Sequence, residues 1–264
     1  MTVATKSTLS IGIDVGSTTT KAVLLDAKRN VVTQYLLATG ASAQKSVQKC
    51  LDELRKSSQQ DLTVVPVIST GYGRRQALNA IKSVTEITCH SVGVHHLNPE
   101  IRTLIDIGGQ DSKVIRIGTD GRPLDFELND KCSAGTGRFL EVMARVLEVS
   151  INELGSLSLK AKRPSTISST CTVFAESEVI GRIGTGESPS DIAAGVHKAM
   201  ASKIATLSQR VGVKSPVSVT GGVALNPGFL YYLAQAIQTE LWVPREPQYT
   251  GALGAAILAL GGGE

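Results

Sequence analysis

Apolar and polar positions along this chain follow two different periods, which predict strands in some segments and helices in others. Two short apolar runs, at residues 11–15 and 104–107, each contain an Asp, pass through a polar turn with Gly, and resume at residues 22–25 and 114–117. Paired runs joined by such a turn are typical of β-hairpins. Further apolar runs predict strands at residues 31–37, 64–68, 124–128 and 217–220.

Helices are predicted where apolar residues recur every three or four positions. Residues 42–56 show this spacing, and a second helix at residues 86–97 is expected to end at Asn98-Pro99. From Gly135 onward the pattern is mainly helical. It predicts helices near residues 136–148, 151–157, 173–184, 189–211 and 251–260, and one with Pro227 in its first turn.

The two hairpins share one motif, at positions 92 residues apart (Asp14 and Asp106). Each has an Asp, a β-branched residue, a Gly, a polar tip, and a Lys seven positions after the Asp. One such Asp-x-Gly is usually only a turn, because Asp bonds its own backbone and Gly accepts positive φ. Two matched copies instead indicate a phosphate site, with N–H groups for phosphate oxygens and carboxylates for the water shell of Mg²⁺.

The length of 264 residues is enough for two lobes, and we expect them at residues 1–101 and 102–264. Aromatic residues make up only 4% of the chain, which argues against a stacking platform for single-stranded nucleic acid. The net charge of +4 is scattered, so nucleic acid is not an expected partner. No run of 18 apolar residues occurs, and residues 1–10 lack a signal-peptide core. These features predict a cytoplasmic protein that does not enter the membrane.

The four cysteines should therefore be reduced thiols or metal ligands. Cys50 lies on an apolar helix face and Cys89 is next to His90, and we favour a packing role for both. Cys132 and Cys171 each precede a predicted helix, where free N–H groups stabilise a thiolate or an anionic cluster. From the residues alone, these two are equally well explained as structural cysteines or as ligands.

Five segments together carry a resemblance to a known family. They are the two loops, Ile11 to Lys21 and Leu104 to Lys113, and the segments STGYGR (69–74), NDKCSAGTGR (129–138) and STCTVFAESE (169–178). With the Gly221-Gly222 turn, they resemble the activators of 2-hydroxyacyl-CoA dehydratases and the ATPase subunits of benzoyl-CoA reductase, the BadF/BadG/BcrA/BcrD-type ATPases. The resemblance covers Ile11 to Leu260, and the cysteine segments are its most specific part.

This resemblance implies an α/β fold, the two-lobed ATPase fold of actin, sugar kinases and Hsp70 with duplicated ribonuclease H-like subdomains. It implies Asp14 and Asp106 near Mg²⁺, which they would hold through water, and Gln110 as the residue that orients the attacking water. It implies nucleotide contacts from the two loops and the glycine turns: Gly16, Ser17, Thr18, Thr19, Lys21, Gly108, Gly109, Gly135, Gly137, Gly221 and Gly222.

The same resemblance implies a homodimer with one [4Fe-4S] cluster shared between subunits, held by Cys132 and Cys171 of each chain. The implied activity is an ATPase that passes a low-potential electron to a 2-hydroxyacyl-CoA dehydratase or a related iron–sulfur reductase, with ferredoxin or flavodoxin as donor. The alternative is a sugar or acyl kinase of the same superfamily, although no segment here marks a sugar site. A chaperone-like scaffold would need a client-binding domain for which the chain leaves no room.

Overall fold

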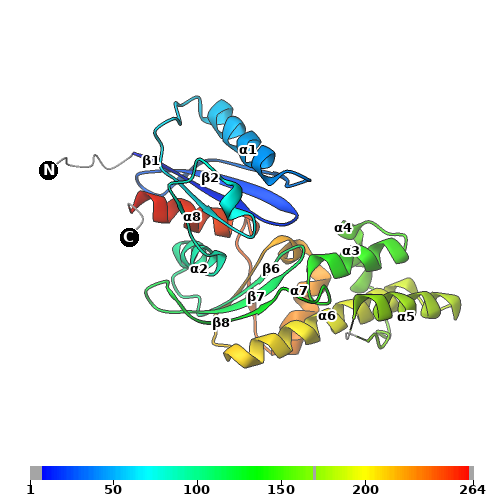
Figure 1. Cartoon of the computed structure of the whole chain (residues 1–264). Helices are drawn as coiled ribbons and strands as arrows, with labels where there is room; N and C mark the ends of the chain where they lie inside the picture. The colour runs from blue at the N-terminus through cyan, green and yellow to red at the C-terminus, as the bar shows by residue number, and fades with distance from the viewer. Residues whose placement is uncertain (1–7, 169–170, 262–264) are drawn as a thin grey trace. The chain divides into compact units, whose positions relative to one another are not determined.

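The computed structural model describes residues 8–168 and 171–261, and its chain divides into two compact units. Among the described residues, unit 1 comprises the chain up to Glu100, the turn Ile117–Pro123 and the chain from Gln248 onward. Unit 2 comprises Ile101–Arg116 and Leu124–Pro247. Figure 1 shows the elements of both units.

Unit 1 is built on a five-stranded mixed sheet in the order β3-β2-β1-β4-β5. Strands β1, β2 and β3 form an antiparallel meander, and β4 runs parallel to β1. Its elements are β1 (Leu9–Val15), β2 (Thr19–Asp26), β3 (Val31–Ala38), α1 (Ala43–Ser58), β4 (Val67–Thr70), β5 (Lys82–Ser83), α2 (Glu86–Leu97) and α8 (Thr250–Leu260), with a 3₁₀ turn at Arg74–Gln76.

Alternation along β2 places its apolar side chains on both faces of this sheet. Ala22 and Leu24 pack with α1, whereas Val23 and Leu25 pack with α8. Both faces of the strand are therefore buried by a helix, which explains its nearly continuous apolar sequence.

Helix α8 approaches its neighbours closely because it is made largely of Gly and Ala. A Cβ atom added at Gly254 would lie 1.8 Å from the carbonyl oxygen of Cys89 in α2. Real side chains do not tolerate such a distance, so a larger residue here forces the two helices apart.

Replacing Gly254 by Ala should therefore destabilise the protein by about 1–3 kcal/mol through overpacking. The midpoint of urea unfolding measures this effect. Gly181 on the exposed surface of α5 (Thr172–Gly184) is the matched control, since apart from the nearby backbone of its own helix no atom lies within 4 Å of an added Cβ there. Gly181→Ala should be neutral or stabilising by up to about 1 kcal/mol, so equal losses in the two variants would contradict the packing argument.

Unit 2 repeats the sheet of unit 1 in the order β10-β9-β6-β7-β8. Strands β6 and β7 pair antiparallel, and β9 lies parallel between β6 and β10. The elements are β6 (Thr103–Ile107), β7 (Ser112–Ile117), β8 (Pro123–Asn129), α3 (Gly137–Val146), α4 (Ile151–Ser158), α5, α6 (Pro189–Val211), β9 (Val217–Thr220), α7 (Pro227–Ile237) and β10 (Leu241–Trp242), with a 3₁₀ turn at Gly222–Leu225.

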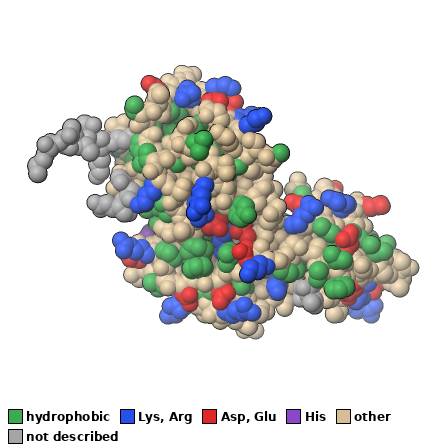
Figure 2. Space-filling model, in the orientation of Figure 1, with side chains coloured by type: hydrophobic (Ala, Val, Ile, Leu, Met, Phe, Trp, Pro, Cys, Tyr) green, Lys and Arg blue, Asp and Glu red, His purple; other side chains and the backbone are tan. Residues whose placement is uncertain are grey.

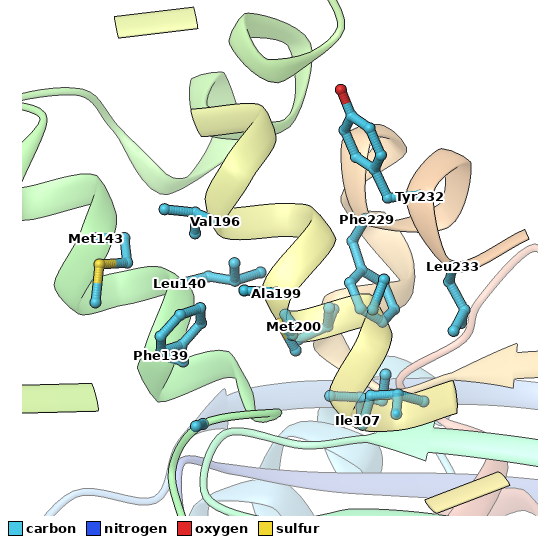
Figure 3. Packing of buried hydrophobic residues seen from close by; sticks show 14 of the residues in the cluster. Ile107, Phe139, Leu140, Met143, Val196, Ala199, Met200, Phe229, Tyr232 and Leu233 are labelled. Carbon is cyan, nitrogen blue, oxygen red and sulfur yellow. The ribbon is translucent and has the colours of Figure 1, made fainter. Parts of the chain in front are cut away.

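The core of unit 2 is centred on α6, the longest helix of the described chain. Figure 3 shows Val196 and Met200 of this helix between Phe139 of α3 and Phe229 of α7. The helix face turned to the sheet meets Ile107 at the end of β6. The elements that carry the cysteines and the second Asp loop therefore share one packed core.

The observed elements confirm most of the predicted ones. The predicted strand at residues 64–68 is shifted, and β4 begins at Val67 instead. Pro66 has no N–H group to contribute to a sheet, and it sits just before the strand, where its carbonyl accepts a bond from Ile11 N at 2.9 Å. The two-residue strands β5 and β10 were not predicted, because two residues carry no periodicity.

None of the helices in residues 8–168 and 171–261 is both long enough and apolar enough to cross a membrane. On the face drawn in Figure 2, Lys and Arg side chains are interspersed with Asp and Glu side chains. This distribution agrees with the scattered charge expected from the sequence.

Candidate functional site: two phosphate-type loops and two half-buried cysteines

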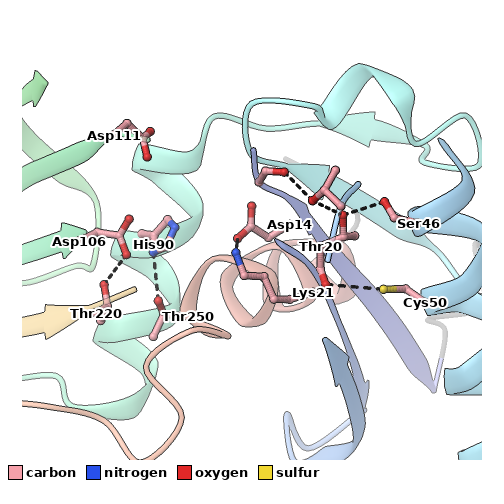
Figure 4. A network of polar contacts seen from close by, with 12 residues as sticks. Asp14, Thr20, Lys21, Ser46, Cys50, His90, Asp106, Asp111, Thr220 and Thr250 are labelled. Atoms are coloured by element: carbon pink, nitrogen blue, oxygen red, sulfur yellow. Dashed lines mark hydrogen bonds and ion pairs between the residues drawn. The ribbon is translucent and has the colours of Figure 1, made fainter. Parts of the chain in front are cut away.

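The first Asp loop is the tight connection between β1 and β2. Its turn is closed by a bond from Gly16 N to Thr19 O at 3.1 Å, and Ser17 and Thr18 at its tip are exposed. Asp14 is buried at the end of β1 and forms an ion pair with Lys21, with Oδ2 and Nζ 3.1 Å apart (Figure 4). The loop thus has exposed hydroxyl groups at its tip and, at its base, a carboxylate whose charge is paired with that of Lys21.

A buried set of hydroxyl groups supports this loop from behind. Thr39 donates to the carbonyl oxygen of Gly16 at 2.8 Å, and the hydroxyl of Thr20 lies 3.0 Å from Thr39 and 2.9 Å from Ser46. The thiol of Cys50 packs beneath, 3.8 Å from the carbonyl oxygen of Thr20. Burial raises the pKa of Cys50 to about 12, so this cysteine stays protonated and unreactive.

Two other segments of unit 1 complete the surroundings of Asp14. The Gly-rich loop after β4 is attached to β1 by a bond from Gly73 N to Val15 O at 2.8 Å. Cys89 is fully buried in α2, and burial raises its pKa to about 12. Both properties fit the packing role predicted for Cys89.

The second Asp loop connects β6 to β7 and has the same construction. Lys113 is buried and bonds Asp106 at 3.1 Å and Asp111 at 2.9 Å, in each case through an Oδ2 atom. The other carboxylate oxygen of Asp106 accepts the hydroxyl of Thr220 at 2.7 Å (Figure 4). Gly108 N donates to Asp111 O at 3.0 Å, which leaves Gln110 exposed at the tip.

The sequence repeat is therefore a structural repeat, in which each Lys folds back across the hairpin onto its own Asp. The charges differ, however. The first loop pairs one carboxylate with one ammonium group, whereas the second places Asp106 and Asp111 around a single Lys113. The second loop keeps one net negative charge, which favours a divalent cation.

The glycine turn after β9 lies against this second loop. Thr220 pairs with Asp106 in the parallel β6–β9 register. Gly221 has φ of +85°, and a Cβ added there would lie 2.2 Å from the carbonyl oxygen of Ile107. Only glycine fits such a conformation at such a distance. Gly222 follows at the exposed start of a 3₁₀ turn.

Cys132 and Cys171 lie in the same unit as the second loop. Both thiols are free and half-buried, and Cys171 is the N-cap residue of α5. The residues that follow them touch, since the hydroxyls of Ser133 and Thr172 are 2.7 Å apart. The two cysteine segments are thus held side by side. Ser169 and Thr170, which precede Cys171 in the family motif, lie outside the described residues.

The predicted site residues fall into two groups. Unit 1 carries Asp14, Gly16, Ser17, Thr18, Thr19 and Lys21. Unit 2 brings together the second loop, the glycine turn, the α3 start and the cysteines: Asp106, Gly108, Gly109, Gln110, Gly135, Gly137, Gly221, Gly222, Cys132 and Cys171.

Three polar residues of this region were not predicted from the sequence. Thr220 bonds Asp106, Asp111 shares Lys113, and Asn129 donates to the carbonyl oxygen of Cys132 at 2.9 Å. Asn129 stands in the motif around Cys132, and Thr220 directly precedes the glycine turn, so adjacency to a motif was the available signal.

Comparison with known proteins places this arrangement in a family. A family model described as the BadF/BadG/BcrA/BcrD ATPase family matches residues 11–259. The 2-hydroxyisocaproyl-CoA dehydratase activator of Clostridioides difficile is 44% identical over 95% of this chain and 94% of its own. The (R)-2-hydroxyglutaryl-CoA dehydratase activating ATPase of Acidaminococcus fermentans is 41% identical over 96% and 97%.

Solved structures agree on the fold. The activator of the 2-hydroxyisocaproyl-CoA dehydratase from Clostridium difficile, with bound ADPNP, has a TM-score of 0.91 and 43% identity, covering 97% of this chain and 95% of that one. A ROK-family glucokinase from Streptomyces griseus has a TM-score of 0.59 at 13% identity, covering 95% and 98%, and shows the shared kinase-like fold alone. The predicted α/β ATPase fold is confirmed. This chain belongs to the BadF/BadG/BcrA/BcrD ATPase family.

Proposed function

We propose that this protein is an ATP-dependent reductive activator, a homodimeric [4Fe-4S] ATPase that passes a low-potential electron to a 2-hydroxyacyl-CoA dehydratase or a related iron–sulfur reductase. The observation that carries this proposal is the near-full-length match to dehydratase activators at 41–44% identity. The cysteines, the loops and an exposed helix face each support one part of it.

Nucleotide binding is supported by the chemistry of the two loops. The exposed hydroxyls of Ser17 and Thr18 and the backbone N–H group of Gly109 are suited to phosphate oxygens, whereas the N–H group of Gly108 is used within its own turn. Both oxygens of Asp106 already accept a hydrogen bond. This carboxylate therefore suits a Mg²⁺ ion held through water, which retains several waters in most protein sites. Gln110, exposed at the loop tip, orients the attacking water.

The cysteine geometry fits half of a [4Fe-4S] ligand set. Such a cluster takes four thiolates, and the Ser133–Thr172 contact holds the Cys132 and Cys171 segments together. The described residues hold no group of three or more His, Cys, Asp or Glu that would complete a metal site within one chain. Two chains related by a two-fold axis supply the four thiolates. When bound, the cluster stores one electron and releases it at low potential.

The surface next to Cys171 supports the dimer. Val173 and Phe174, in the first turn of α5, are 64% and 67% exposed, and Ile180 lies 55% exposed two turns further along. Large apolar side chains grouped on one helix favour a protein contact. A second copy that shares the cluster would meet this helix first, because Cys171 is its N-cap residue.

ATP is needed in this scheme when the acceptor is harder to reduce than the donor. Plant-type ferredoxins lie near −400 mV, so a ferredoxin or flavodoxin donor alone would suffice for an easier acceptor. An acceptor whose chemistry returns the electron would stay active over many turnovers, so the activator works in substoichiometric amounts.

The test is electron transfer from the reduced protein to a 2-hydroxyacyl-CoA dehydratase under anaerobic conditions. We expect the dehydratase to become active with MgATP and to remain inactive with MgADP. The same rate and extent with ADP would refute ATP-gated transfer. A colourless anaerobic preparation that phosphorylates sugars would favour a kinase, since the cluster-bearing protein should be brown and bleach in air.

A further inference from the structure

The second phosphate-type loop provides the N-terminal cap of helix α3. The first N–H groups of a helix lack partners within the helix. In α3 two of them are satisfied by this loop, since Gly137 N donates to Gly108 O and Arg138 N to Gly109 O, both at 2.9 Å. Thr136, the N-cap residue, directs its hydroxyl elsewhere, to Ser133 O at 2.9 Å. A shift of the loop backbone therefore displaces the start of α3.

Asn129 provides a second link between this loop and the cysteine segment. Its side-chain amide donates to the carbonyl oxygen of Cys132 at 2.9 Å, with weaker contacts to the Ser112 hydroxyl at 3.4 Å and Ala134 O at 3.5 Å. Ser112 is the first residue of β7, directly after Asp111. One amide thus spans from the strand that leaves the phosphate-type loop to the backbone of the cysteine.

The connection continues to the second cysteine. Ser133 follows Cys132, and its hydroxyl lies 2.7 Å from that of Thr172, the first residue of α5. Hydrogen bonds therefore link β7 to Asn129, Asn129 to the backbone of Cys132, and Ser133, the next residue of the chain, to the helix that begins after Cys171.

We propose that Asn129 is a positioning residue that transmits the state of the nucleotide site to Cys132. The proposal rests on the proposed function and names the residue through which its two sites communicate. Asparagine suits the role because its amide supplies two N–H donors directed at neutral oxygen acceptors. An Asp at this position has the same shape but no donor, and its charge would face the carbonyls of Cys132 and Ala134.

The first test uses iron-free protein, so that it does not depend on the cluster. The rate at which iodoacetamide alkylates Cys132 is measured by peptide mass spectrometry, without nucleotide and with MgADPNP. In the wild type we expect the nucleotide to change this rate at least threefold. In Asn129→Asp the rate without nucleotide should rise severalfold, and the effect of the nucleotide should shrink to less than 1.5-fold.

Asn152→Asp is the matched control, because Asn152 is exposed on α4 of the same unit. It should behave like the wild type. A nucleotide effect of wild-type size in Asn129→Asp would overturn the assignment, as would a loss of the effect in Asn152→Asp. ADP binding measured by titration shows whether each variant is folded.

The second test uses the iron-loaded protein and follows removal of iron by a chelator, with MgADP and with MgADPNP. The ratio of the two rates should differ from one in the wild type and approach one in Asn129→Asp. If Asn129→Asp retains ADP binding but loses iron, that loss supports the positioning of Cys132. In that case Thr172→Val, which replaces the hydroxyl by a methyl group, tests the hydrogen bond between Ser133 and Thr172. A ratio of the two iron-removal rates equal to that of the wild type would overturn the proposed connection.

Failure of the inference can be distinguished from failure of the proposed function. Wild-type protein that binds no iron and transfers no electron contradicts the proposed function. Wild-type protein that does both, with a normal nucleotide effect in Asn129→Asp, contradicts only the role of Asn129.

Discussion

Replacing Cys171 by Ala should leave anaerobically purified protein with iron near background and without the brown colour. The cluster of the proposed dimer takes two thiolates from each chain, so one substitution removes two of four ligands by symmetry. Partial binding is not expected, because the remaining Cys132 thiolates cannot hold four irons. Association of the two chains should weaken along with the cluster.

Cys50→Ala is the control for this experiment. Cys50 is buried, its pKa is raised to about 12 by burial, and it packs against the hydroxyl network behind the first loop. Its replacement should lower the free energy of unfolding by about 1 kcal/mol through lost packing, with the iron content unchanged.

Iron analysis and sedimentation of both variants test whether Cys171 is a cluster ligand. Wild-type iron in Cys171→Ala would remove Cys171 from the ligand set. The Cys171→Ala variant should still bind ADP, because Cys171 is not part of either phosphate-type loop.

Secondary structure was largely predictable here because most elements have one buried face. Val47, Cys50, Leu51 and Leu54 of α1 are all buried, as their helical spacing predicts. The predicted end of α2 before Asn98-Pro99 is also confirmed. The repeat of the Asp loops extends to the whole strand order, which recurs in the second sheet as the duplicated subdomains implied by the resemblance would predict.

The partner of the last helix could not be predicted in this way. Helix α8 is apolar on nearly all sides, which predicts that it is buried but not which elements it packs against. Its contacts with β1 and α2 join residues about 160 to 250 positions apart, and Gly254 against Cys89 is one of them. Local periodicity carries no information on such contacts, although the many small residues of α8 signal close packing.

In the site, too, contacts between residues near in sequence were predictable and contacts between distant residues were not. The Asp–Lys pairs are local, spanning seven residues across one hairpin, and the matched spacing was visible in the sequence. The bond from Thr220 to Asp106 spans 114 positions and depends on the parallel register of β6 and β9. A shift of one residue in that register would turn Thr220 to the other face of the sheet.

Asp106→Asn should abolish measurable ATP hydrolysis, with a loss of roughly 100-fold or more, while the protein keeps its iron. Asp106 is 3% exposed, and its two carboxylate oxygens are bonded by Lys113 and Thr220. These contacts fix the orientation of the carboxylate. The amide removes the negative charge that would hold the water shell of Mg²⁺. It also leaves the buried ammonium of Lys113 with Asp111 as its one remaining charged partner in this loop.

The measurement is steady-state ATPase activity alongside iron content and ADP affinity. Asp125→Asn, an exposed acid on β8 of the same unit, is the control and should keep wild-type activity. Loss of iron as well as activity in Asp106→Asn would indicate unfolding of unit 2, because both cysteines share its core. Retained iron with normal hydrolysis would exclude Asp106 from the metal site. Retained iron with hydrolysis lost would support two distinct roles, in which the carboxylate of β6 acts at the nucleotide site and the cysteines before α3 and α5 bind the cluster.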